Sequence, residues 1–425
     1  MSFDTLGLEP RVLRGVEAMG YTSPTEIQSK AIPHVLAGRD VVGCAQTGTG
    51  KTAAFMLPTL SRIPTRSGIR ALVVTPTREL AVQIDEVTRK ASRFSGHRSA
   101  VVHGGVGYTP QISRLRKGVE VLVACPGRLL DLNDRGVVNL STVDVLILDE
   151  ADRMLDMGFW PDVRRIISLI PKERQNLLFS ATMSPQVLKI VQSTLTDPVR
   201  IDTAPTTTPV ERIEQAIYPV EQGQKTALLV EMLKRDDHDR VLVFTRTKHR
   251  ADRVKKQLER QGIHAAAIHG GRSQPQRQRA LDGFKRGRTR VLVATDVASR
   301  GIDVDNISHV INYDMPGTPE DYVHRIGRTA RAGAEGTAAS FLAPEEMDNL
   351  KDLERTTGNV IKCADLEGFD YKHRVVPDPN RSAKPARNNQ RPSGQGQGRK
   401  GRQGSRKRSQ RRNGGGQRGN QAKAG

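Results

Sequence analysis

The stretch that organises this chain reads Ala45-Gln46-Thr47-Gly48-Thr49-Gly50-Lys51-Thr52. An apolar run at 40–44 precedes it and a helix-compatible run at 52–57 follows, which is the strand, loop and helix context of a phosphate-binding P-loop. The two glycines let the backbone curl so that successive N–H groups and the helix N-terminus face one anion. In that geometry Lys51 reaches the β- and γ-phosphates and the Thr52 hydroxyl ligates Mg²⁺. The sequence therefore predicts a nucleotide site along residues 45–52. The alternative is a Gly/Thr-rich turn before a helix.

A second motif supports the nucleotide site. Val145-Leu146-Ile147-Leu148-Asp149-Glu150 places two carboxylates at the end of an apolar, β-branched run. Such a run is typical of a buried parallel strand, and the carboxyl ends of these strands are where an open α/β sheet binds ligands. Asp149 can hold Mg²⁺ through water, while Glu150 orients and deprotonates an attacking water. An ordinary strand end is the alternative, and the P-loop upstream argues against it.

The length and the cysteines constrain the class of protein. A chain of 425 residues exceeds one ordinary core, so two globular units are expected. No leader-like segment and no apolar run of about twenty residues is present, which predicts a soluble, cytoplasmic protein without membrane contact. Cys44, Cys125 and Cys363 lie far apart and outside any metal-binding spacing, so we interpret them as packing residues.

The net charge of +21 is unevenly distributed. Residues 381–425 contain fourteen Lys and Arg and no acidic residue, which leaves +7 for residues 1–380. This segment is rich in Gly, Gln and Ser and has no Phe, Tyr or Trp, so it is expected to be disordered. A flexible cationic arm without an amphipathic face favours sequence-independent contact with RNA over contact with a membrane. A purely solubilising tail is the alternative.

Strand-like runs recur through the first half and alternate with helical patterns. An amphipathic lead-in helix is expected from Phe3 to Gly20, followed by Gln28, whose amide complements the edge of adenine. A surface position on a helix is the competing interpretation of Gln28. The predicted strands are 40–44, 71–75, 100–103, 121–124, 145–149 and 177–180. Polar, glycine-rich or cationic residues follow several of them, which suits a phosphodiester backbone. The fold class is therefore α/β, with a parallel sheet flanked by helices.

The same alternation restarts after a linker at 202–209. Strands are expected at 241–245, 265–269, 291–295 and 310–313, but no second P-loop occurs. Arg328 and Arg331 are three residues apart and would share one helical face or turn. Two arginines without adjacent acids point to an anion, and arginine fingers from a facing domain stabilise charge in phosphoryl transfer. A solvated basic face is the alternative.

Taken together, these strings resemble the DEAD-box family of ATP-dependent RNA helicases, in the family's order, over residues 1–370. Asp149-Glu150-Ala151-Asp152 is the tetrapeptide that names the family. The resemblance implies two tandem RecA-like domains, with ATP and RNA bound across the cleft between them. The expected boundaries are 1–204 for the ATP-binding domain, 205–371 for the helicase domain and 372–425 for the basic tail.

The resemblance also assigns residues. Phe3 and Tyr21 match the positions flanking adenine, Gln28 the adenine reader and Asp303 the ribose contact. Arg328 and Arg331 match the γ-phosphate arginines, and His324 the contact to the acidic motif of the first domain. Ser180-Ala181-Thr182 matches the motif that couples hydrolysis to strand separation by hydrogen bonding to Asp152. The matching RNA positions are Pro76, Thr77, Arg78, Gly105, Gly127, Arg128, Gln274, Arg277, Thr295 and Arg300.

Three positions depart from the common pattern. Ala45 begins the P-loop in place of Gly. Cys125 replaces the usual Thr before Pro-Gly-Arg, so one hydroxyl contact to RNA is expected to be missing. Ala330 replaces the usual Gly between the arginines, which a helical backbone should tolerate. The short core and the basic tail look most like the bacterial RhlE-type subgroup.

The function implied is ATP hydrolysis coupled to RNA binding and to local opening of short duplexes or remodelling of RNA–protein complexes. An ATP-gated RNA clamp with little unwinding is the main alternative, and a DNA translocase is a weaker one. The cofactors implied are ATP and Mg²⁺. The expected partners are RNA, contacted mainly through its backbone, and proteins of RNA processing or ribosome assembly. A monomer acting in ribosome biogenesis or RNA degradation is expected.

Overall fold

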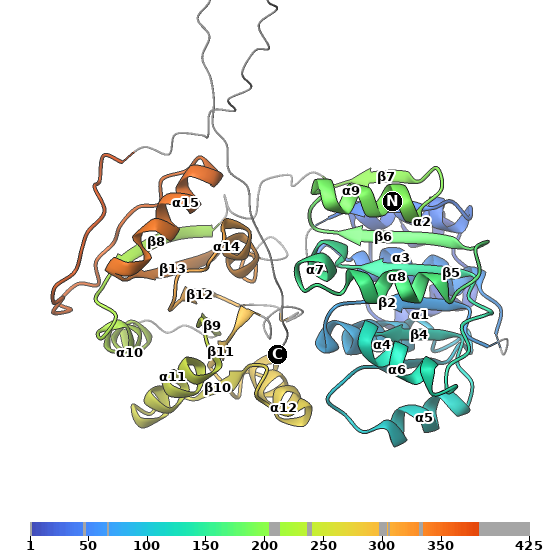
Figure 1. The fold of residues 1–425 in the computed structure, drawn as a ribbon, viewed down its shortest axis with the longest axis horizontal. Helices are drawn as coiled ribbons and strands as arrows, with labels where there is room; N and C mark the ends of the chain where they lie inside the picture. Colours follow the sequence, from blue (N-terminus) through green and yellow to red (C-terminus); the bar gives the residue numbers. More distant parts are fainter. Residues whose placement is uncertain are drawn as a thin grey trace, which may run out of the picture. The chain divides into compact units, whose positions relative to one another are not determined.

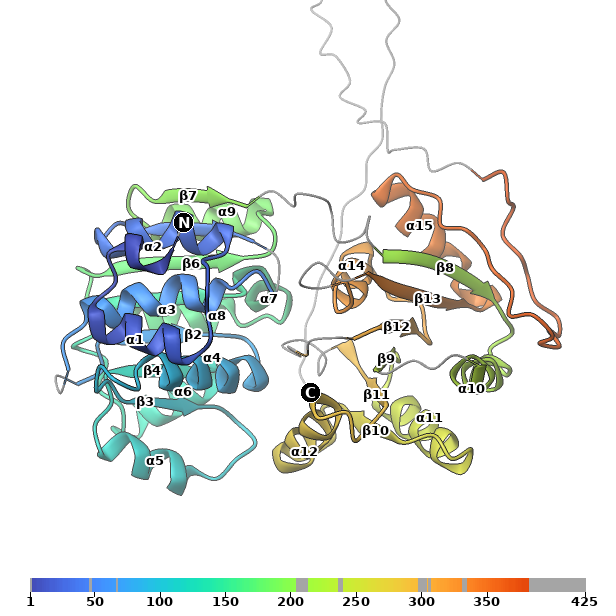
Figure 2. The ribbon, with the colours of Figure 1, turned by 180° about the vertical axis from the view of Figure 1, so that it is seen from behind.

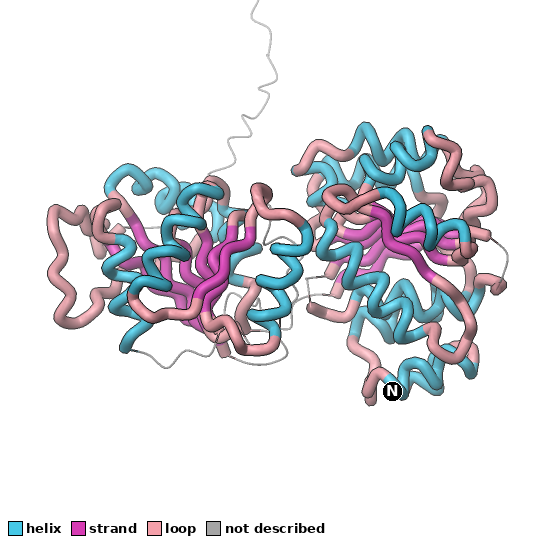
Figure 3. Tube along the Cα trace, turned by 90° about the horizontal axis from the view of Figure 1, so that it is seen from below, coloured by secondary structure: helices cyan, strands magenta, loops and turns pink. Residues whose placement is uncertain are grey.

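The computed structural model describes residues 2–45, 48–65, 68–203, 213–235, 240–296, 304, 307–330 and 335–381. Within them the chain forms two parallel sheets, each covered by helices on both faces (Figures 1 and 3). The expected α/β class with two RecA-like parallel sheets is therefore confirmed. The predicted boundary at 204/205 falls outside the described residues.

The first sheet has strand order β3-β4-β2-β5-β6-β1-β7, and every pairing is parallel. Its strands are β1 (Val41–Cys44), β2 (Ala71–Val74), β3 (Ser99–Val102), β4 (Val121–Ala124), β5 (Val145–Asp149), β6 (Gln175–Ser180) and β7 (Val199–Asp202). The six predicted strands of this half are present, with bounds shifted by no more than two residues. The edge strand β7 was not predicted.

Helices cover both faces of this sheet. One layer comprises η1 (Phe3–Leu6), α1 (Pro10–Ala18), α2 (Glu26–Leu36), α3 (Lys51–Arg62) and α4 (Arg78–Ala91). The other comprises α5 (Tyr108–Arg116), α6 (Pro126–Asp134), α7 (Ala151–Asp156), α8 (Trp160–Ser168) and α9 (Pro185–Thr194). Figure 1 views the sheet from the side of α6, α8 and α9, and Figure 2 from the side of α1, α2 and α3.

The strand β5 shows why its sequence is apolar throughout. Val145 and Ile147 pack into the core under the first helix layer, whereas Leu146 and Leu148 pack into the core under the second. All five residues of the strand are buried. A strand covered on both faces has no solvent side on which polar residues could alternate. The continuous run therefore predicts burial on both sides, which carries Asp149 to the edge of the sheet inside the protein.

The expected single lead-in helix at 3–20 is wrong. The structure has the short 3-10 helix η1, a break at Gly7 and then α1. Gly7 adopts a left-handed conformation with φ 78°, which ends η1. The Glu9 side chain then accepts a hydrogen bond from the Val12 N–H at 3.3 Å, and Pro10 occupies the first helical position. These termination and initiation signals divide the amphipathic pattern into two elements.

The second sheet has strand order β10-β11-β9-β12-β13-β8 and is also parallel throughout. Its strands are β8 (Ile213–Pro219), β9 (Val241–Phe244), β10 (Ala265–Ile268), β11 (Val291–Ala294), β12 (His309–Asn312) and β13 (Gly336–Leu342). Its helices are α10 (Lys225–Arg235), α11 (Lys248–Arg260), α12 (Gln274–Lys285), α14 (Pro319–Ile326), η3 (Pro344–Glu346) and α15 (Met347–Thr357). The four predicted strands are confirmed, while β8 and β13 were missed.

The described chain continues beyond the predicted end of the second domain at 371. The Lys372 N–H donates to Gln224 Oε1 at 2.7 Å. Arg381 donates from Nε and Nη2 to the Glu354 carboxylate, at distances from 2.8 to 3.0 Å. Residues 372–381 therefore contact the helices of the second sheet, and the predicted tail from 382 onward lies outside the described residues.

Two absences hold within the described ranges. No helix there is long and apolar enough to cross a membrane. The cysteines of that part are all free thiols, and Cys125 is buried in the first core, as expected for a packing residue.

Candidate active site

Three predicted motifs meet at the carboxyl edge of the first sheet. The strand β6 lies between β1 and β5, with Cys44 opposite Ser180 and Asp149 opposite Phe179. The P-loop follows β1, the acidic motif follows β5, and the Ser180 motif ends β6. Because parallel strands end at the same edge, residues far apart in sequence become neighbours there.

The loop after β1 has the backbone of an anion site. Gly48 and Gly50 adopt φ values of 88° and 90°, a left-handed conformation that residues with a side chain rarely adopt. Gly50 is the N-cap of α3 and supplies no side-chain acceptor, so the first N–H groups of the helix receive none from the cap. Lys51 is 8% exposed, and its Nζ donates to the Ala45 carbonyl at 2.7 Å. A buried cation beside a helix N-terminus fits a phosphate group. Gln46 and Thr47 lie outside the described residues.

Gln28 joins this loop to the preceding helix. It is 4% exposed, so the surface interpretation of this residue is wrong. Its Nε2 donates to the Gly50 carbonyl at 3.1 Å, and its Oε1 accepts from the Thr25 N–H at 2.9 Å, which caps α2. A Cβ atom at position 50 would overlap Gln28 Nε2. Gly50 is therefore required both by its backbone conformation and by this close approach.

Two aromatic rings lie near the start of the chain. The Phe3 and Tyr21 centroids are 6.4 Å apart with an angle of 24° between the ring planes. Phe3 is buried in the first core, whereas Tyr21 is exposed. Tyr21 thus offers the accessible ring of the pair.

The acidic motif is buried at the end of β5. Asp149 is 2% exposed, and its Oδ1 accepts the Glu150 N–H at 3.0 Å. Burial raises the pKa of Asp149 to about 7, although the charge of Lys51 acts in the opposite direction. Glu150 has φ 54°, a strained conformation for a residue with a side chain, and its Oε2 lies 3.3 Å from Arg153 Nη1. Asp149 has lost its hydration through burial, so a bound cation would stabilise its carboxylate.

The donor set fits Mg²⁺ bound together with phosphates. No cluster of three or more His, Cys, Asp or Glu that could hold a metal occurs among the described residues. Mg²⁺ is usually held by one or two carboxylates, waters and substrate phosphates, so such a cluster is not needed. Asp149 and the Thr52 hydroxyl are the side chains at this edge that could take part.

Asp152 connects the acidic motif to the end of β6. Its Oδ2 accepts three hydrogen bonds, from Ala181 N at 3.1 Å, Thr182 N at 2.9 Å and Thr182 Oγ1 at 3.1 Å. In return the Asp152 N–H donates to Ser180 Oγ at 3.3 Å. Any displacement of the Ser180–Thr182 segment therefore acts directly on the helix that follows Asp149 and Glu150.

Three loops that follow β2, β3 and β4 also come together. The Arg78 guanidinium packs against Gly104 and Gly105, and a Cβ atom on Gly105 would overlap it. Arg128 donates from Nη1 to the Val106 carbonyl at 3.1 Å. The structure thus places Arg78, Gly105 and Arg128 in one cluster. Pro76 and Thr77 precede α4, and the Thr77 hydroxyl accepts from the Leu80 N–H at 3.3 Å.

Gly127 and Cys125 lie at the start of α6. Cys125 is the N-cap residue and makes no side-chain cap hydrogen bond. Burial raises the pKa of its thiol to about 12, so the group is neutral and buried at neutral pH.

The second sheet carries the remaining candidates. Thr295 follows β11, His324 lies on α14, and Gln274 and Arg277 lie in the first turn of α12. Arg328 lies just after α14, and its Nε donates to the His324 carbonyl at 3.3 Å. Arg300, Asp303 and Arg331 lie outside the described residues.

One expectation around Arg328 needs correction. The helix α14 ends at Ile326 and Arg328 lies in the turn that follows, while position 331 lies outside the described residues, so the predicted pairing of the two arginines stays a prediction. Ala330 is not helical either, because its φ is 55°. A left-handed conformation favours Gly at this position, and the Ala costs about 1 kcal/mol there.

Sequence reasoning missed Arg325, which is 3% exposed. Its Nε and Nη2 donate to the two oxygens of Asp296 at 2.6 and 2.7 Å. Its Nη1 donates to Asn312 Oδ1 at 3.1 Å and to the Asp314 carbonyl at 2.7 Å. Arg325 therefore fixes α14 to the ends of β11 and β12. Its sequence neighbours are polar or charged on most positions, so no local signal indicated that Arg325 is buried.

Comparison with known proteins identifies relatives of both halves. Residues 25–190 match the family described as DEAD/DEAH box helicase, and residues 224–333 match the helicase conserved C-terminal domain. The chain is 42% identical over 370 residues to DEAD-box ATP-dependent RNA helicase CshA of Bacillus cereus, covering 87% of this chain and 70% of that protein. It is 44% identical over 367 residues to ATP-dependent RNA helicase DeaD of Mycobacterium tuberculosis, covering 86% of this chain and 65% of that protein.

Solved structures give the same result. Dbp5 of S. cerevisiae bound to RNA and ADP BeF3 is 32% identical with a TM-score of 0.77, over 85% of this chain and 95% of that one. The DEAD-box helicase Mss116 bound to ssRNA and UDP-BeF is 28% identical with a TM-score of 0.79, over 87% of this chain and 81% of that one.

Proposed function

This chain belongs to the DEAD-box family of ATP-dependent RNA helicases, and we propose that it hydrolyses ATP in response to RNA and opens short RNA duplexes. The observation that carries the proposal is the meeting of the P-loop, the acidic motif and the Ser180 motif on adjacent strands, with Asp152 hydrogen bonded to Thr182. This arrangement connects a phosphate site to a segment that can transmit its state.

In the ATP site each residue has a proposed role. Lys51 offsets the charge of the phosphates, and Asp149 and Thr52 would hold Mg²⁺. When bound, Mg²⁺ neutralises charge that develops on the phosphates. Glu150 orients the attacking water and accepts its proton, a role that suits a buried carboxylate held by Arg153.

The nucleotide is held by residues on both halves of the chain, and those of the first half contact its phosphates and its base. The P-loop residues, including Ala45, Gln46, Thr47, Gly48 and Thr49, follow the phosphates. Gln28 reads adenine, and Phe3 and Tyr21 flank it.

The second half completes the site. Arg328 and Arg331 stabilise the charge of the γ-phosphate, Asp303 contacts the ribose, and His324 contacts the acidic motif of the first half. Each half then holds an incomplete set of catalytic groups, so turnover depends on RNA and ATP bringing the halves together.

The RNA strand is proposed to run along the carboxyl edges of the sheets. The cluster of Arg78, Gly105 and Arg128 supports this, since backbone amides and guanidinium groups suit phosphates and sugars. The remaining contacts assigned to RNA are Pro76, Thr77, Gly127, Gln274, Arg277, Thr295 and Arg300. Contacts of this kind confer little sequence specificity.

Finer assignments rest on the sequence alone. We assign residues 1–204 and 205–371 to the two domains and 372–425 to the tail, whose first residues, 372–381, contact the second domain. The short core and the basic tail favour the RhlE-type subgroup and a cytoplasmic monomer acting with RNA-processing or ribosome-assembly proteins, in ribosome biogenesis or RNA degradation.

The test compares wild type with Lys51→Ala in ATP hydrolysis and in unwinding of a short RNA duplex. Lys51→Ala should abolish both, because electrostatic stabilisation dominates phosphoryl transfer. Hydrolysis above about a tenth of the wild-type rate, a loss of less than about 1.4 kcal/mol of barrier stabilisation, would contradict the P-loop assignment. The number of duplexes opened per ATP consumed separates a helicase from an ATP-gated clamp.

A further inference from the structure

The helix α11 carries a row of exposed basic side chains, His249, Arg253, Lys256 and Arg260, which we call the α11 stripe. Their spacing of four, three and four residues places them on one helical face, within an arc of about 60° at about 100° per residue. The row is about 16 Å long at about 1.5 Å per residue. The motifs of the ATP site make no use of it.

Both acidic residues of α11 have basic partners outside the stripe, although Asp252 borders the same surface hollow as the four stripe residues. Asp252 pairs with Arg272 and lies 3.0 Å from His269 Nε2. Glu259 lies 2.6 Å from Lys255 Nζ. In the described parts of the chain, no carboxylate lies within ion-pair distance of Arg253, Lys256 or Arg260. Arg253, Lys256 and Arg260 therefore present three positive charges to solvent without an ion-pair partner in those parts of the chain.

The stripe begins at the edge proposed to bind RNA. The helix α11 starts just after β9, whose last residue Phe244 pairs with Ala294 of β11, next to Thr295. The His249 end of the stripe thus lies at the carboxyl edge of the sheet, and the Arg260 end lies toward the opposite edge. The stripe can continue a path that starts at that edge.

The helix α11 also contacts the loop before α12, and α12 begins with another residue proposed to bind RNA. Asp252 holds His269 and Arg272 in the loop that leads into α12, and Gln274 begins α12. Figure 2 shows α11 and α12 on either side of β10. Asp252 therefore links the helix that carries the stripe to the loop that leads into α12.

The chemistry of the stripe selects its partner. It contains no Phe, Tyr, Trp or large aliphatic side chain, whereas the core of a protein interface is anchored by such groups. Its one ring is the His249 imidazole at one end, so it lacks the series of aromatic rings on which successive unpaired bases stack at single-strand sites. A straight row of cations suits the regular phosphate backbone of a duplex, since nucleic-acid interfaces are polar and strongly positive.

We propose that the α11 stripe binds the phosphate backbone of an RNA duplex that flanks the single strand held at the carboxyl edge. This inference rests on the proposed function and extends it to the substrate, which would be a single strand joined to a duplex. The stripe would keep the enzyme beside structured RNA while the core acts on the adjoining strand.

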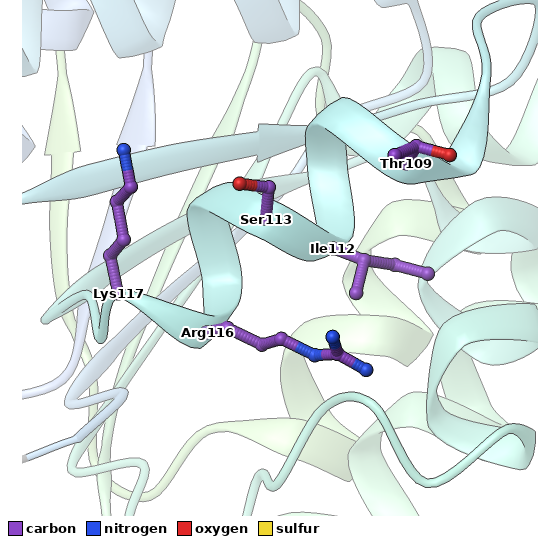
Figure 4. Close-up of a pocket in the computed structure, with 5 residues that line it drawn as sticks. All are labelled: Thr109, Ile112, Ser113, Arg116 and Lys117. Carbon is purple, nitrogen blue, oxygen red and sulfur yellow. The ribbon is translucent and has the colours of Figure 1, made fainter.

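A matched control is provided by α5, which ends in three exposed cations, Arg114, Arg116 and Lys117. Figure 4 shows Arg116 and Lys117 directed away from each other, and the same face carries Thr109, Ile112 and Ser113. The end of α5 therefore carries the same number of exposed Arg and Lys side chains as the α11 stripe, but they do not form a straight row.

The experiment compares the full-length triple variants R253Q/K256Q/R260Q and R114Q/R116Q/K117Q with wild type. Affinity is measured against salt for a hairpin with a single-stranded extension and for the extension alone. The α11 variant should lower the slope of log affinity against log salt by about 2 to 3 on the hairpin, at about 0.7 to 0.9 per phosphate contact. Its slope on the extension alone, and its ATP turnover at saturating single-stranded RNA, should match wild type. The charge-preserving variant R253K/R260K should bind as wild type does.

Three results would overturn the proposal. They are an unchanged slope in the α11 variant, an equal loss in the α5 variant, and an equal loss on the extension alone. If RNA does not stimulate wild-type ATP hydrolysis, the proposed function itself fails. If RNA does stimulate it and the slopes are unchanged, only the α11 inference fails.

Discussion

Replacing Thr182 with Val should separate ATP hydrolysis from strand opening. The substitution keeps the shape of the side chain and removes one of the three donors to Asp152 Oδ2, the hydroxyl at 3.1 Å. The backbone N–H groups of Ala181 and Thr182 still donate to that oxygen. A hydrogen bond to a charged group contributes about 1.5 to 3 kcal/mol, and the remaining donors place the loss near the lower value of about 1.5 kcal/mol.

That magnitude gives two measurable effects. A domain of this size loses about 2 to 4 °C of Tm per kcal/mol, so Tm should fall by about 3 to 6 °C. If the bond transmits the state of the ATP site, the number of duplexes opened per ATP should fall about tenfold, since about 1.4 kcal/mol corresponds to a factor of ten. The RNA-stimulated rate of ATP hydrolysis should stay near wild type, because Lys51 and Glu150 are unchanged.

Two further variants control this experiment. Thr182→Ser retains the hydroxyl group and should restore unwinding. Thr109→Val makes the same chemical change at an exposed position on α5 and should have no effect. The reasoning is refuted if Thr182→Val unwinds RNA as efficiently per ATP as wild type, or if hydrolysis and unwinding fall by the same factor.

Other predictions follow from single contacts. Gln28→Ala removes the hydrogen bonds of this side chain to Gly50 and Thr25, so the affinity for ATP and the preference for ATP over GTP should both decrease. An unchanged preference for ATP in competition binding would show that another group reads the base. Ala330→Gly relieves a left-handed φ and should raise the free energy of unfolding by about 1 kcal/mol, whereas a lower value in denaturant titration would contradict the strain. Deleting residues 382–425 removes thirteen Lys and Arg but keeps the Arg381–Glu354 pair. The slope of log affinity against log salt should then become shallower by about 0.7 per lost contact, with turnover at saturating RNA unchanged; an unaltered slope would mean that the tail does not contact RNA.

The sequence predicted the strands with the strongest apolar runs. β5 is an example, because a strand buried on both faces must be apolar throughout. The strands it did not predict have weaker signals: β13 reads Gly-Thr-Ala-Ala-Ser-Phe-Leu, and β7 buries one of its four residues. Their pairing with neighbours compensates for weak local preference, and such tertiary contacts are invisible in a local pattern.

The candidate site was predicted in its residues but not in its contacts. The motif at residues 45–52 indicated the phosphate loop, yet the hydrogen bond from Gln28 to Gly50 depends on how α2 packs beside that loop. Similarly, Gly327 follows Ile326 as the C-cap of α14, and the expectation of a helical backbone at Ala330 overlooked this stop signal. Arg325 was missed because its partners come from two other strands.

The central claim is that RNA and the buried acidic motif act together in ATP hydrolysis. Phosphate release should be measured for wild type and Glu150→Gln without nucleic acid, with RNA, and with DNA of the same sequence. The account predicts strong stimulation of wild type by RNA and little by DNA, since the 2′-hydroxyl distinguishes them. Glu150→Gln should still bind ATP and RNA but release almost no phosphate, because an amide cannot accept the proton of water. Equal wild-type rates with and without RNA, or full turnover by Glu150→Gln, would contradict it.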